Sequence, residues 1–181
     1  MSLVNNQPVN NNFLSPLGYK FHIDRMPTFN FFVQAVKVPN INLPAALQTT
    51  PFSVMPFPGD HLQFGTLDVT FKMDEALLTY TEIFDWMQAL GFPEQYEQYR
   101  AGTIPTNSST GKRNTVSDAS LTVLSSAMNP IFIYKFRNLF PTSIGSFNFD
   151  TRDSEVTYIT CEVQFKFGFM TVSRDPQEYG A

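Results

Sequence analysis

The chain has 181 residues, enough for one domain with a real core, and a net charge of −4 at pH 7. A single cysteine excludes an intramolecular disulfide, and scattered lysines and arginines argue against tight nucleic-acid binding, which needs a clustered basic surface. Charged residues make up only 15% of the chain, against about 25% in typical soluble domains, while aromatics also reach 15%. Such a chain must hide apolar surface beyond its own core, as broad subunit contacts would do, unless one aromatic-rich core takes it all.

The first part of the chain predicts a flexible segment followed by two strands. Residues 1–12 contain five asparagines and no apolar period, so we expect a flexible N-terminal segment before a single domain over residues 13–172. Alternation predicts a strand at residues 19–24. After a turn at residues 26–28, an apolar run predicts a second strand at residues 30–38.

Residues 39–58 combine five prolines with many apolar side chains. A loop that is both stiffened by proline and apolar is costly to leave in water, so we predict that it contacts neighbouring subunits or rings. Residues 52–57 could form a short edge strand, where proline is tolerated. The predicted subunit-contact residues are Leu43, Leu47, Phe52, Met55 and Phe57.

Residues 56–90 join a turn at Gly59-Asp60, an alternating strand and a capped helix. The alternation at residues 67–73 predicts a half-buried strand. Asp74 stands where a helix N-cap belongs, and Gly91 with the proline that follows ends the helix. The predicted apolar face of this helix consists of Leu77, Tyr80, Phe84, Met87 and Leu90.

The rest of the chain predicts a mobile loop and further strands. Residues 103–118 are polar and read as a long mobile loop, and residues 173–181 as a C-terminal tail. Strands are predicted at residues 119–125, 131–138, 143–150 and 156–169, the last containing Cys161 as a packed core residue. The sequence therefore predicts a mainly β fold, an antiparallel β-barrel or sandwich of about eight strands with one flanking α-helix.

Every side chain that could carry chemistry has a structural explanation. The two histidines lack a third ligand at metal-binding spacing, the paired carboxylates after the strand are explained by capping, and the paired serines lack a nucleophile elbow. Trp86 is interpreted as a core or subunit-contact residue rather than a ligand platform. The residues considered are His22, His61, Asp74, Glu75, Trp86, Ser125 and Ser126. We predict no catalytic residue, no metal site and no cofactor.

Several short motifs together cover most of the chain. They are the opening strands at residues 19–24 and 31–41, Gly59-Asp60 with Phe64, the strand at residues 67–73 with Asp74-Glu75, Phe84 and Trp86, Phe140-Pro141-Thr142, and strands at residues 146–150 and 156–169. In this combination they resemble the tail tube proteins of contractile-tailed bacteriophages, a family distantly similar to the type VI secretion tube protein.

The resemblance implies a structural protein of the virion, made in the host cytoplasm. Its subunits would form hexameric rings that stack around a DNA-conducting channel, with the tail sheath and the baseplate or tail-terminator proteins as partners. The low positive charge fits transient, non-specific contact with DNA along a mildly acidic wall. No apolar stretch approaches the roughly 20 residues that span a bilayer, so we expect no membrane insertion.

Two alternatives stay open from the sequence. The long loop at residues 103–118 and the N-terminal segment depart from a minimal tube subunit, and they would suit an adaptor at the baseplate or head end of the tail. In a different class, the chain would be a β-barrel module that binds an apolar ligand among its many phenylalanines.

Overall fold

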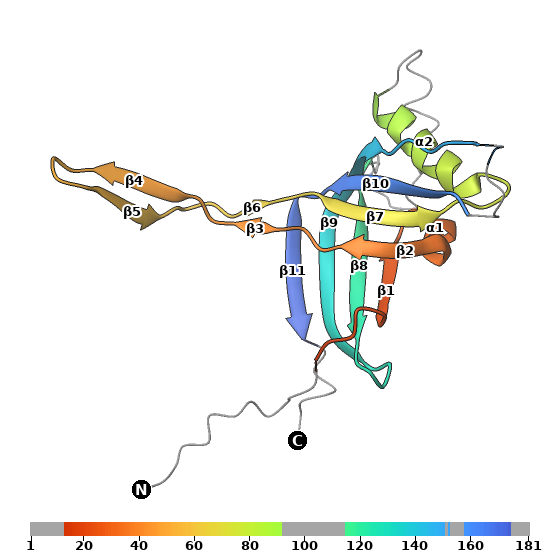
Figure 1. The fold of residues 1–181 in the computed structure, drawn as a ribbon, viewed down its shortest axis with the longest axis horizontal. Coiled ribbons are helices and arrows are strands. Elements are labelled where there is room, and N and C mark those ends of the chain that lie inside the picture. Colours follow the sequence, from red (N-terminus) through yellow and green to blue (C-terminus); the bar gives the residue numbers. More distant parts are fainter. Residues whose placement is uncertain (1–12, 92–114, 151, 153–157, 175–181) are drawn as a thin grey trace, which may run out of the picture.

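The computed structural model describes residues 13–91, 115–150, 152 and 158–174 (Figure 1). Within these residues the chain forms eleven strands and two helices, beginning with β1 (Tyr19–Ile23), α1 (Pro27–Phe32) and β2 (Val33–Lys37). The other elements are β3 (Ile41–Asn42), β4 (Ala45–Thr49), β5 (Val54–Pro58), β6 (Gln63–Phe64), β7 (Leu67–Lys72), α2 (Leu78–Gly91), β8 (Ser117–Leu124), β9 (Pro130–Ile144), β10 (Thr160–Lys166) and β11 (Phe169–Arg174). The prediction of a mainly antiparallel β fold is confirmed.

Three predicted segments fall largely outside the described residues. The N-terminal segment 1–12 lies wholly outside them, as does most of the predicted loop at residues 103–118. Only residues 173–174 of the predicted tail are described, and they belong to β11. Neither of the two described helices is long and apolar enough to cross a membrane.

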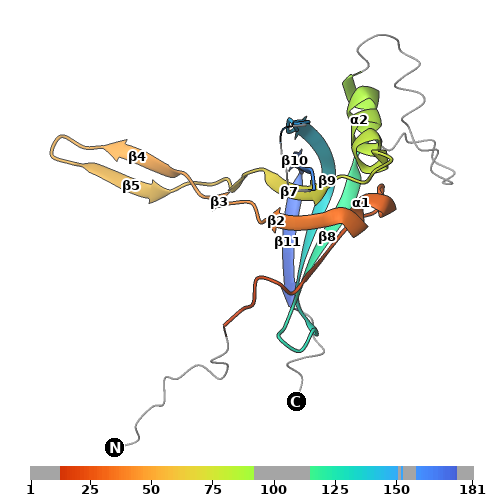
Figure 2. The ribbon, with the colours of Figure 1, turned by 45° about the vertical axis from the view of Figure 1, so that its right-hand side comes forward.

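The strands form two sheets that share β9. The first part of β9 pairs with β8 and β11, and β8 pairs in turn with β1; we call these four strands sheet I. The last part of β9 pairs with β10, followed by β7 and β2, which form sheet II. Figures 1 and 2 show the strands of the two sheets running in crossing directions. Because β1 and β2, the two ends of the path, do not pair in the described residues, the fold is an open sandwich and not a closed barrel.

A β-bulge carries β9 from sheet I into sheet II. The register between β8 and β9 shifts beside Asp118. Asn138, opposite it, has a φ of 55°, in the left-handed region that asparagine tolerates better than most residues. Its backbone N–H donates to the Asp118 carboxylate at 3.0 Å. A bulge held in this way bends the long strand and redirects it into the second sheet.

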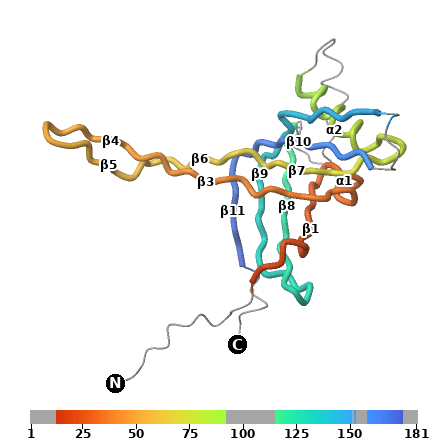
Figure 3. Tube along the Cα trace, in the orientation of Figure 1, coloured from red at the N-terminus to blue at the C-terminus, as the bar shows by residue number. Residues whose placement is uncertain are grey.

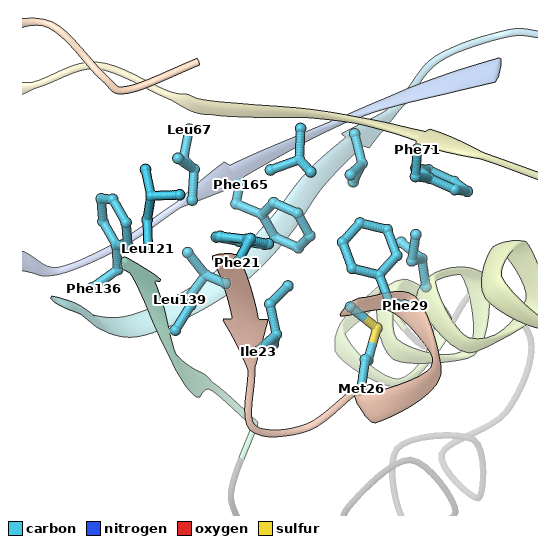
Figure 4. Packing of buried hydrophobic residues seen from close by; sticks show 14 of the residues in the cluster. Phe21, Ile23, Met26, Phe29, Leu67, Phe71, Leu121, Phe136, Leu139 and Phe165 are labelled. Carbon is cyan, nitrogen blue, oxygen red and sulfur yellow. The ribbon is translucent and has the colours of Figure 1, made fainter. Parts of the chain in front are cut away.

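The core lies between the two sheets and against both helices (Figure 4). The ring of Phe29 on α1 lies 5.0 Å from that of Phe71 on β7 and 6.4 Å from that of Phe165 on β10, in tilted and edge-on arrangements. Trp86 of α2 completes the group, with its ring 6.3 Å from Phe165. The largest fully buried side chains are Trp86, Phe29, Phe71, Phe136, Phe165, Ile23, Leu67, Ile83, Leu139, Val69, Val163 and Thr79.

The predicted strand at residues 30–38 is wrong in its first part. The chain forms the short helix α1 there, and the strand β2 starts only at Val33. Pro27 occupies the start of α1, where its missing N–H costs nothing and its fixed φ suits a helix. The apolar run was ambiguous between strand and helix, and the burial of Phe29 between the sheets settles it as a helix.

The prediction for the end of the chain is also wrong in part. Residues 145–150 form no strand, because β9 runs on through Pro141 and ends at Ile144. The long strand predicted at residues 156–169 ends at Lys166, and β11 follows it after a turn at Phe167-Gly168. Apolar and polar residues continue to alternate through this turn, so the sequence pattern does not reveal it. Gly168 was the one residue there that indicated a break in the strand.

The predicted helix exists, but its buried face is displaced from the predicted one. Its buried residues are Thr79, Ile83, Trp86 and Ala89, while Met87 and Leu90 pack at the margin of the core. Leu77 precedes the helix with a φ of 55°, and Phe84 points into solvent. The indole N–H of Trp86 donates to the carbonyl of Thr115 at 3.0 Å, which fixes the rotation of the helix about its axis.

The predicted cap of α2 is confirmed. The Asp74 carboxylate accepts hydrogen bonds from the backbone N–H groups of Leu78 and Thr79, at 3.0 and 3.1 Å, and from the Thr79 hydroxyl. The Thr79 hydroxyl bond is the main cause that lowers the pKa of Asp74 below its ordinary value of 3.8. Capping of this kind satisfies donors that have no partner within the helix.

Asp74→Ala is expected to lower the free energy of unfolding by about 1 kcal/mol at pH 7, because two helix N–H groups lose their acceptor. A carboxylate with a lowered folded-state pKa stabilises the protein above its unfolded pKa and loses that effect as the pH falls through the folded value. The difference between wild type and Asp74→Ala should therefore shrink below about pH 4 in urea unfolding series. Asp74→Asn, which keeps an acceptor without a titrating charge, is the control. A difference unchanged down to pH 2 would contradict this assignment.

Candidate assembly surfaces

A long two-stranded hairpin projects away from the sandwich. We call residues 41–64, which include β3 to β6, the hairpin extension. It continues the pairing of β2 with β7: the N–H of Gly65 donates to the carbonyl of Asn40 at 3.0 Å, and the β3–β6 and β4–β5 pairs follow. Figures 1 to 3 show that it leaves the body at the end of β2 and β7 and that no other described helix or strand lies beside its far half.

The tip of the hairpin extension is a tight turn that presents Phe52. The N–H of Thr50 donates to the carbonyl of Ser53 at 2.9 Å, and the N–H of Ser53 donates to the Thr50 hydroxyl at 3.1 Å. These bonds enclose Pro51 and Phe52 in the turn, and proline restricts the backbone there further. Phe52 is 99% exposed. A large aromatic side chain is thus held on an ordered turn and is almost fully exposed to solvent.

The hairpin extension contains all five predicted contact residues, and every one of them is exposed. These are Leu43, Leu47, Phe52, Met55 and Phe57, joined by the exposed side chains of Ile41, Val54 and Leu62. Because side chains alternate along a strand, Leu47 and Val54 lie on one face of the hairpin, and Met55 and Phe57 lie on the other. Residues 38–59 contain no charged side chain. An exposed segment without charge is poorly suited to remain in water.

The structure corrects the predicted shape of this region. Residues 39–58 form mainly a hairpin and not a loop, and the edge strand predicted at residues 52–57 is β5, shifted toward the C-terminus. Gly59-Asp60 does not reverse the chain; it lies between β5 and β6. A Cβ at Gly59 would come within 2.0 Å of the Pro44 carbonyl oxygen, so the glycine allows the two strands to approach closely there.

Sheet I ends in two free edges, on β1 and on β11. Among the described residues, β1 pairs only with β8, and β11 pairs only with β9. All pairings in the sheet are antiparallel, so β1 runs parallel to β9 and antiparallel to β11. If β1 of one molecule met β11 of the next, the new pair would again be antiparallel. The sheet could therefore continue from molecule to molecule without changing its type of pairing.

The edge of β1 is partly covered by its own chain. The Ile23 N–H donates to the side-chain oxygen of Asn30 at 2.7 Å, and the amide nitrogen of Asn30 donates back to the Ile23 carbonyl at 3.3 Å. The rest of this edge borders a groove of about 630 Å³ lined by β1, α1 and the start of β2. The Tyr19 hydroxyl spans it to the carbonyl of Gln34, and burial raises the pKa of Tyr19. Asn30 therefore limits the open part of the edge to the region of Tyr19 and Phe21.

The outer face of sheet I is polar and has two cross-strand rows. One row contains Lys20, Thr122, Ile133 and Ser173, and the other contains His22, Ser120, Lys135 and Thr171. These rows contain two lysines and no carboxylate. The His22 ring is flanked by Asp24, with 3.3 Å between Nε2 and the carboxylate, and by the Asn30 amide at 2.8 Å from Nδ1. This face is hydrophilic without being strongly charged.

Four of the side chains that could carry chemistry make structural contacts: His22 and Asp74, as described above, and Trp86 and Ser125. Trp86 is 1% exposed and the Arg25 guanidinium lies 4.9 Å from its ring centre, so its interpretation as a core residue is confirmed. Cys161 is buried, as predicted, and burial raises the pKa of its thiol. The Ser125 hydroxyl accepts two backbone N–H groups of the β8–β9 turn. Within the described residues no group of three or more His, Cys, Asp or Glu side chains could hold a metal ion.

Sequence reasoning missed the free edge of β11 and the role of Asn30. The exposed apolar side chains of β11, Phe169 and Val172, lay within or just beyond what was predicted as one long strand. Asn30 lay inside a predicted strand, so its bonds to Ile23 were not foreseen. The absence of charge over residues 38–59 was a readable sign that this whole segment, and not only a few of its residues, is a candidate contact surface.

The chain is similar to several proteins of known structure. No family model matches it, and no curated protein does. A chain from the sheath–tube complex of the extracellular contractile injection system PVC, in its extended state, is 15% identical with a TM-score of 0.61, covering 91% of this chain and 94% of that chain. A chain from the tube-terminating cap of the anti-feeding prophage AFP is 13% identical with a TM-score of 0.60, covering 97% and 100%. A chain from the PVC sheath/tube terminator is 14% identical with a TM-score of 0.60, covering 91% and 99%. At such identities the likeness establishes the fold, and the chain has the tail-tube-like fold that its motifs imply.

Proposed function

We propose that this protein is a structural subunit of a contractile tail tube, in which subunits close into rings and rings stack head to tail. The observation that carries this proposal is the hairpin extension, an ordered and exposed apolar ribbon that has no charged side chain up to residue 59 and projects from the β sandwich. Contacts of Leu47, Phe52 and their neighbours with other subunits or rings would remove it from water. Burial of each such side chain contributes about 1.5–3 kcal/mol. The likeness of the fold to chains of tube, cap and terminator assemblies supports this function.

Within a ring, we propose that β1 of one subunit pairs with β11 of the next. This contact is heterologous, and repetition by rotation closes a ring with no free sheet edge. The antiparallel alternation of sheet I supports it, since every new pair has the same type of hydrogen bonding. Six subunits to a ring is the number that the motif resemblance implies.

In such a ring, sheet I lines the channel. Its outer face offers serine and threonine side chains with Lys20 and Lys135. Hydroxyl groups keep the wall wet, and the two lysines give transient, non-specific contacts with the phosphates of passing DNA. This wall differs from the mildly acidic one that the net charge alone suggests, because its two central rows contain lysines and no carboxylate, while Asp24 and Asp118 lie at the end of the same face. Together with the motif resemblance, this supports the more specific proposal of a phage virion protein that is assembled in the host cytoplasm and whose channel conducts DNA.

The surrounding partners follow from the same proposal. A tube of this kind lies inside a tail sheath and meets a baseplate at one end and a terminator at the other. An adaptor at one of these ends is the second candidate, and the likeness to a tube-terminating cap is a specific reason to keep it. The apolar-ligand module is not favoured, since Phe29, Phe71 and Phe165 fill the space between the sheets.

The proposal is tested by sedimentation velocity of the purified protein over a hundredfold range of concentration. We expect a monomer at low concentration that converts into a ring and then into larger species as the concentration rises. A ring that forms but does not grow further would favour the adaptor. A monomer across the whole range, under conditions where it is folded, would contradict both assembly functions.

A further inference from the structure

The two long edges of the hairpin extension differ in their backbone groups. In an antiparallel pair, residues alternate between those whose N–H and C=O point to the partner strand and those whose groups point outward. At the tip, the N–H of Thr50 donates to Ser53, so these two residues point inward. Following the register from there, the outward-pointing residues are Ala45, Leu47 and Thr49 on β4, and Val54, Pro56 and Pro58 on β5.

Proline makes one of these edges unable to accept a further strand. Pro56 and Pro58 lack an N–H, so the β5 edge has lost the outward donor at both positions. Their rings also stand where an added strand would lie. The β4 edge, directly across the ribbon, keeps an N–H and a C=O at each of its outward positions. The hairpin extension can therefore be extended by strand pairing on the β4 side alone.

We propose that the outer edge of β4 pairs, strand to strand, with an exposed sheet edge of a second copy of this chain. This inference rests on the proposed function and names the mode of one contact in it. A two-stranded ribbon is marginally stable by itself, and a third strand adds hydrogen bonds and covers apolar surface. The prolines on β5 stop the addition after one strand, which prevents unlimited growth of hairpin on hairpin.

The partner is a second copy because the chain itself offers the complementary edge. Sheet II ends in β2, whose only pairing partner in the described residues is β7. β2 has five residues, the same length as β4. When β1 and β11 join around a ring, the outer edge of β2 still has no strand partner among the described residues, although its Gln34 carbonyl accepts the Tyr19 hydroxyl. The β4 strand contains no charged residue, so its pairing brings no unpaired charge into the contact.

Two proline variants at one cross-strand pair test the inference. Thr49 and Val54 face each other, and both point their backbone groups outward. Thr49→Pro removes an outward donor from β4, while Val54→Pro removes one from β5, which is already blocked. Neither change removes a hydrogen bond between β4 and β5. We expect Thr49→Pro to raise the concentration required for assembly about tenfold or more, and Val54→Pro to leave it within about twofold of wild type.

The contrast between the variants separates strand pairing from simple apolar contact. If the faces of the hairpin alone make the interface, Val54→Pro, which removes an apolar side chain, should weaken assembly at least as much as Thr49→Pro. That result in a wild-type protein that assembles would overturn this inference and leave the proposed function intact. A wild type that never assembles would overturn both.

Hydrogen exchange gives an independent reading on the unmodified protein. On assembly, the amides of Leu47 and Thr49 should slow by at least about tenfold relative to the monomer, and that of Val54 should change less. Circular dichroism of both proline variants at low concentration checks that the sandwich is folded. Equal protection on both edges, or none on β4, would contradict pairing at β4.

Discussion

Replacing Leu47 and Phe52 with aspartate in the same chain is expected to leave a folded monomer and to abolish higher assembly. Leu47 is 69% exposed and Phe52 almost fully exposed, and neither packs against the sandwich, so their loss costs the monomer little. In the assembly, each substitution removes about 1.5–3 kcal/mol of stabilisation from apolar burial and places a carboxylate in an apolar contact. Together these losses weaken each contact by about a hundredfold or more. Sedimentation and circular dichroism measure the two effects separately.

A control must separate the position of the new charges from their number. Ser126→Asp with Asn148→Asp adds the same two charges at exposed positions on the body. This control should assemble as the wild type does. If it fails as well, net charge and not the hairpin extension explains the loss. Normal tubes from the Leu47→Asp, Phe52→Asp protein would show that the hairpin is not the contact proposed here.

Trp86→Ala is expected to lower the free energy of unfolding by about 3–5 kcal/mol, the largest stability effect of any single change considered. The indole is buried between α2, Phe165 and the Arg25 guanidinium, and its loss leaves a large cavity. It also leaves the carbonyl of Thr115 without its donor. Because domains are stable by only about 5–15 kcal/mol, the variant should melt far below the wild type. Urea unfolding followed by circular dichroism measures the change.

Phe84→Ala is the matched comparison on the same helix. Phe84 is 48% exposed and stacks only loosely on Tyr80, with ring centres 6.4 Å apart. We expect a loss below about 1 kcal/mol, as for surface substitutions in general. Equal losses at the two positions would show that the rotation of α2 about its axis differs from the one described. Reduced assembly in a stable Phe84→Ala protein would instead place this side of α2 in a contact.

Much of the sandwich could be predicted because its strands have one solvent-exposed, polar face and one buried, apolar face. β7 and β10 alternate apolar and polar residues almost without exception, and Asp74 marks the start of the helix. Where the pattern permits two readings, prediction failed. The apolar run in Phe31-Phe32-Val33 reads equally as strand or helix, and only the space between the sheets, filled by Phe29, decides it.

The candidate surface could be predicted in its residues but not in its form. The sequence indicates that exposing Leu47 and Phe52 to water has a free-energy cost, and both are exposed in the structure. The extended pairing of β4 with β5 is less visible, because five prolines in residues 39–58 suggest a loop. They fit a hairpin because Pro56 and Pro58 point outward, where no ladder hydrogen bond is lost. The whole sheet topology determines which strand edges remain unpaired, so local sequence patterns cannot predict them.

Electron microscopy of the purified protein at rising concentration tests the central claim most directly. The proposed function predicts hollow rings that stack into long tubes, with sheet I on the channel wall and the hairpin extension against a neighbouring subunit. Single rings that never stack would favour an adaptor at one end of a tail. Compact, folded monomers at every concentration would contradict the claim that this chain is built to assemble.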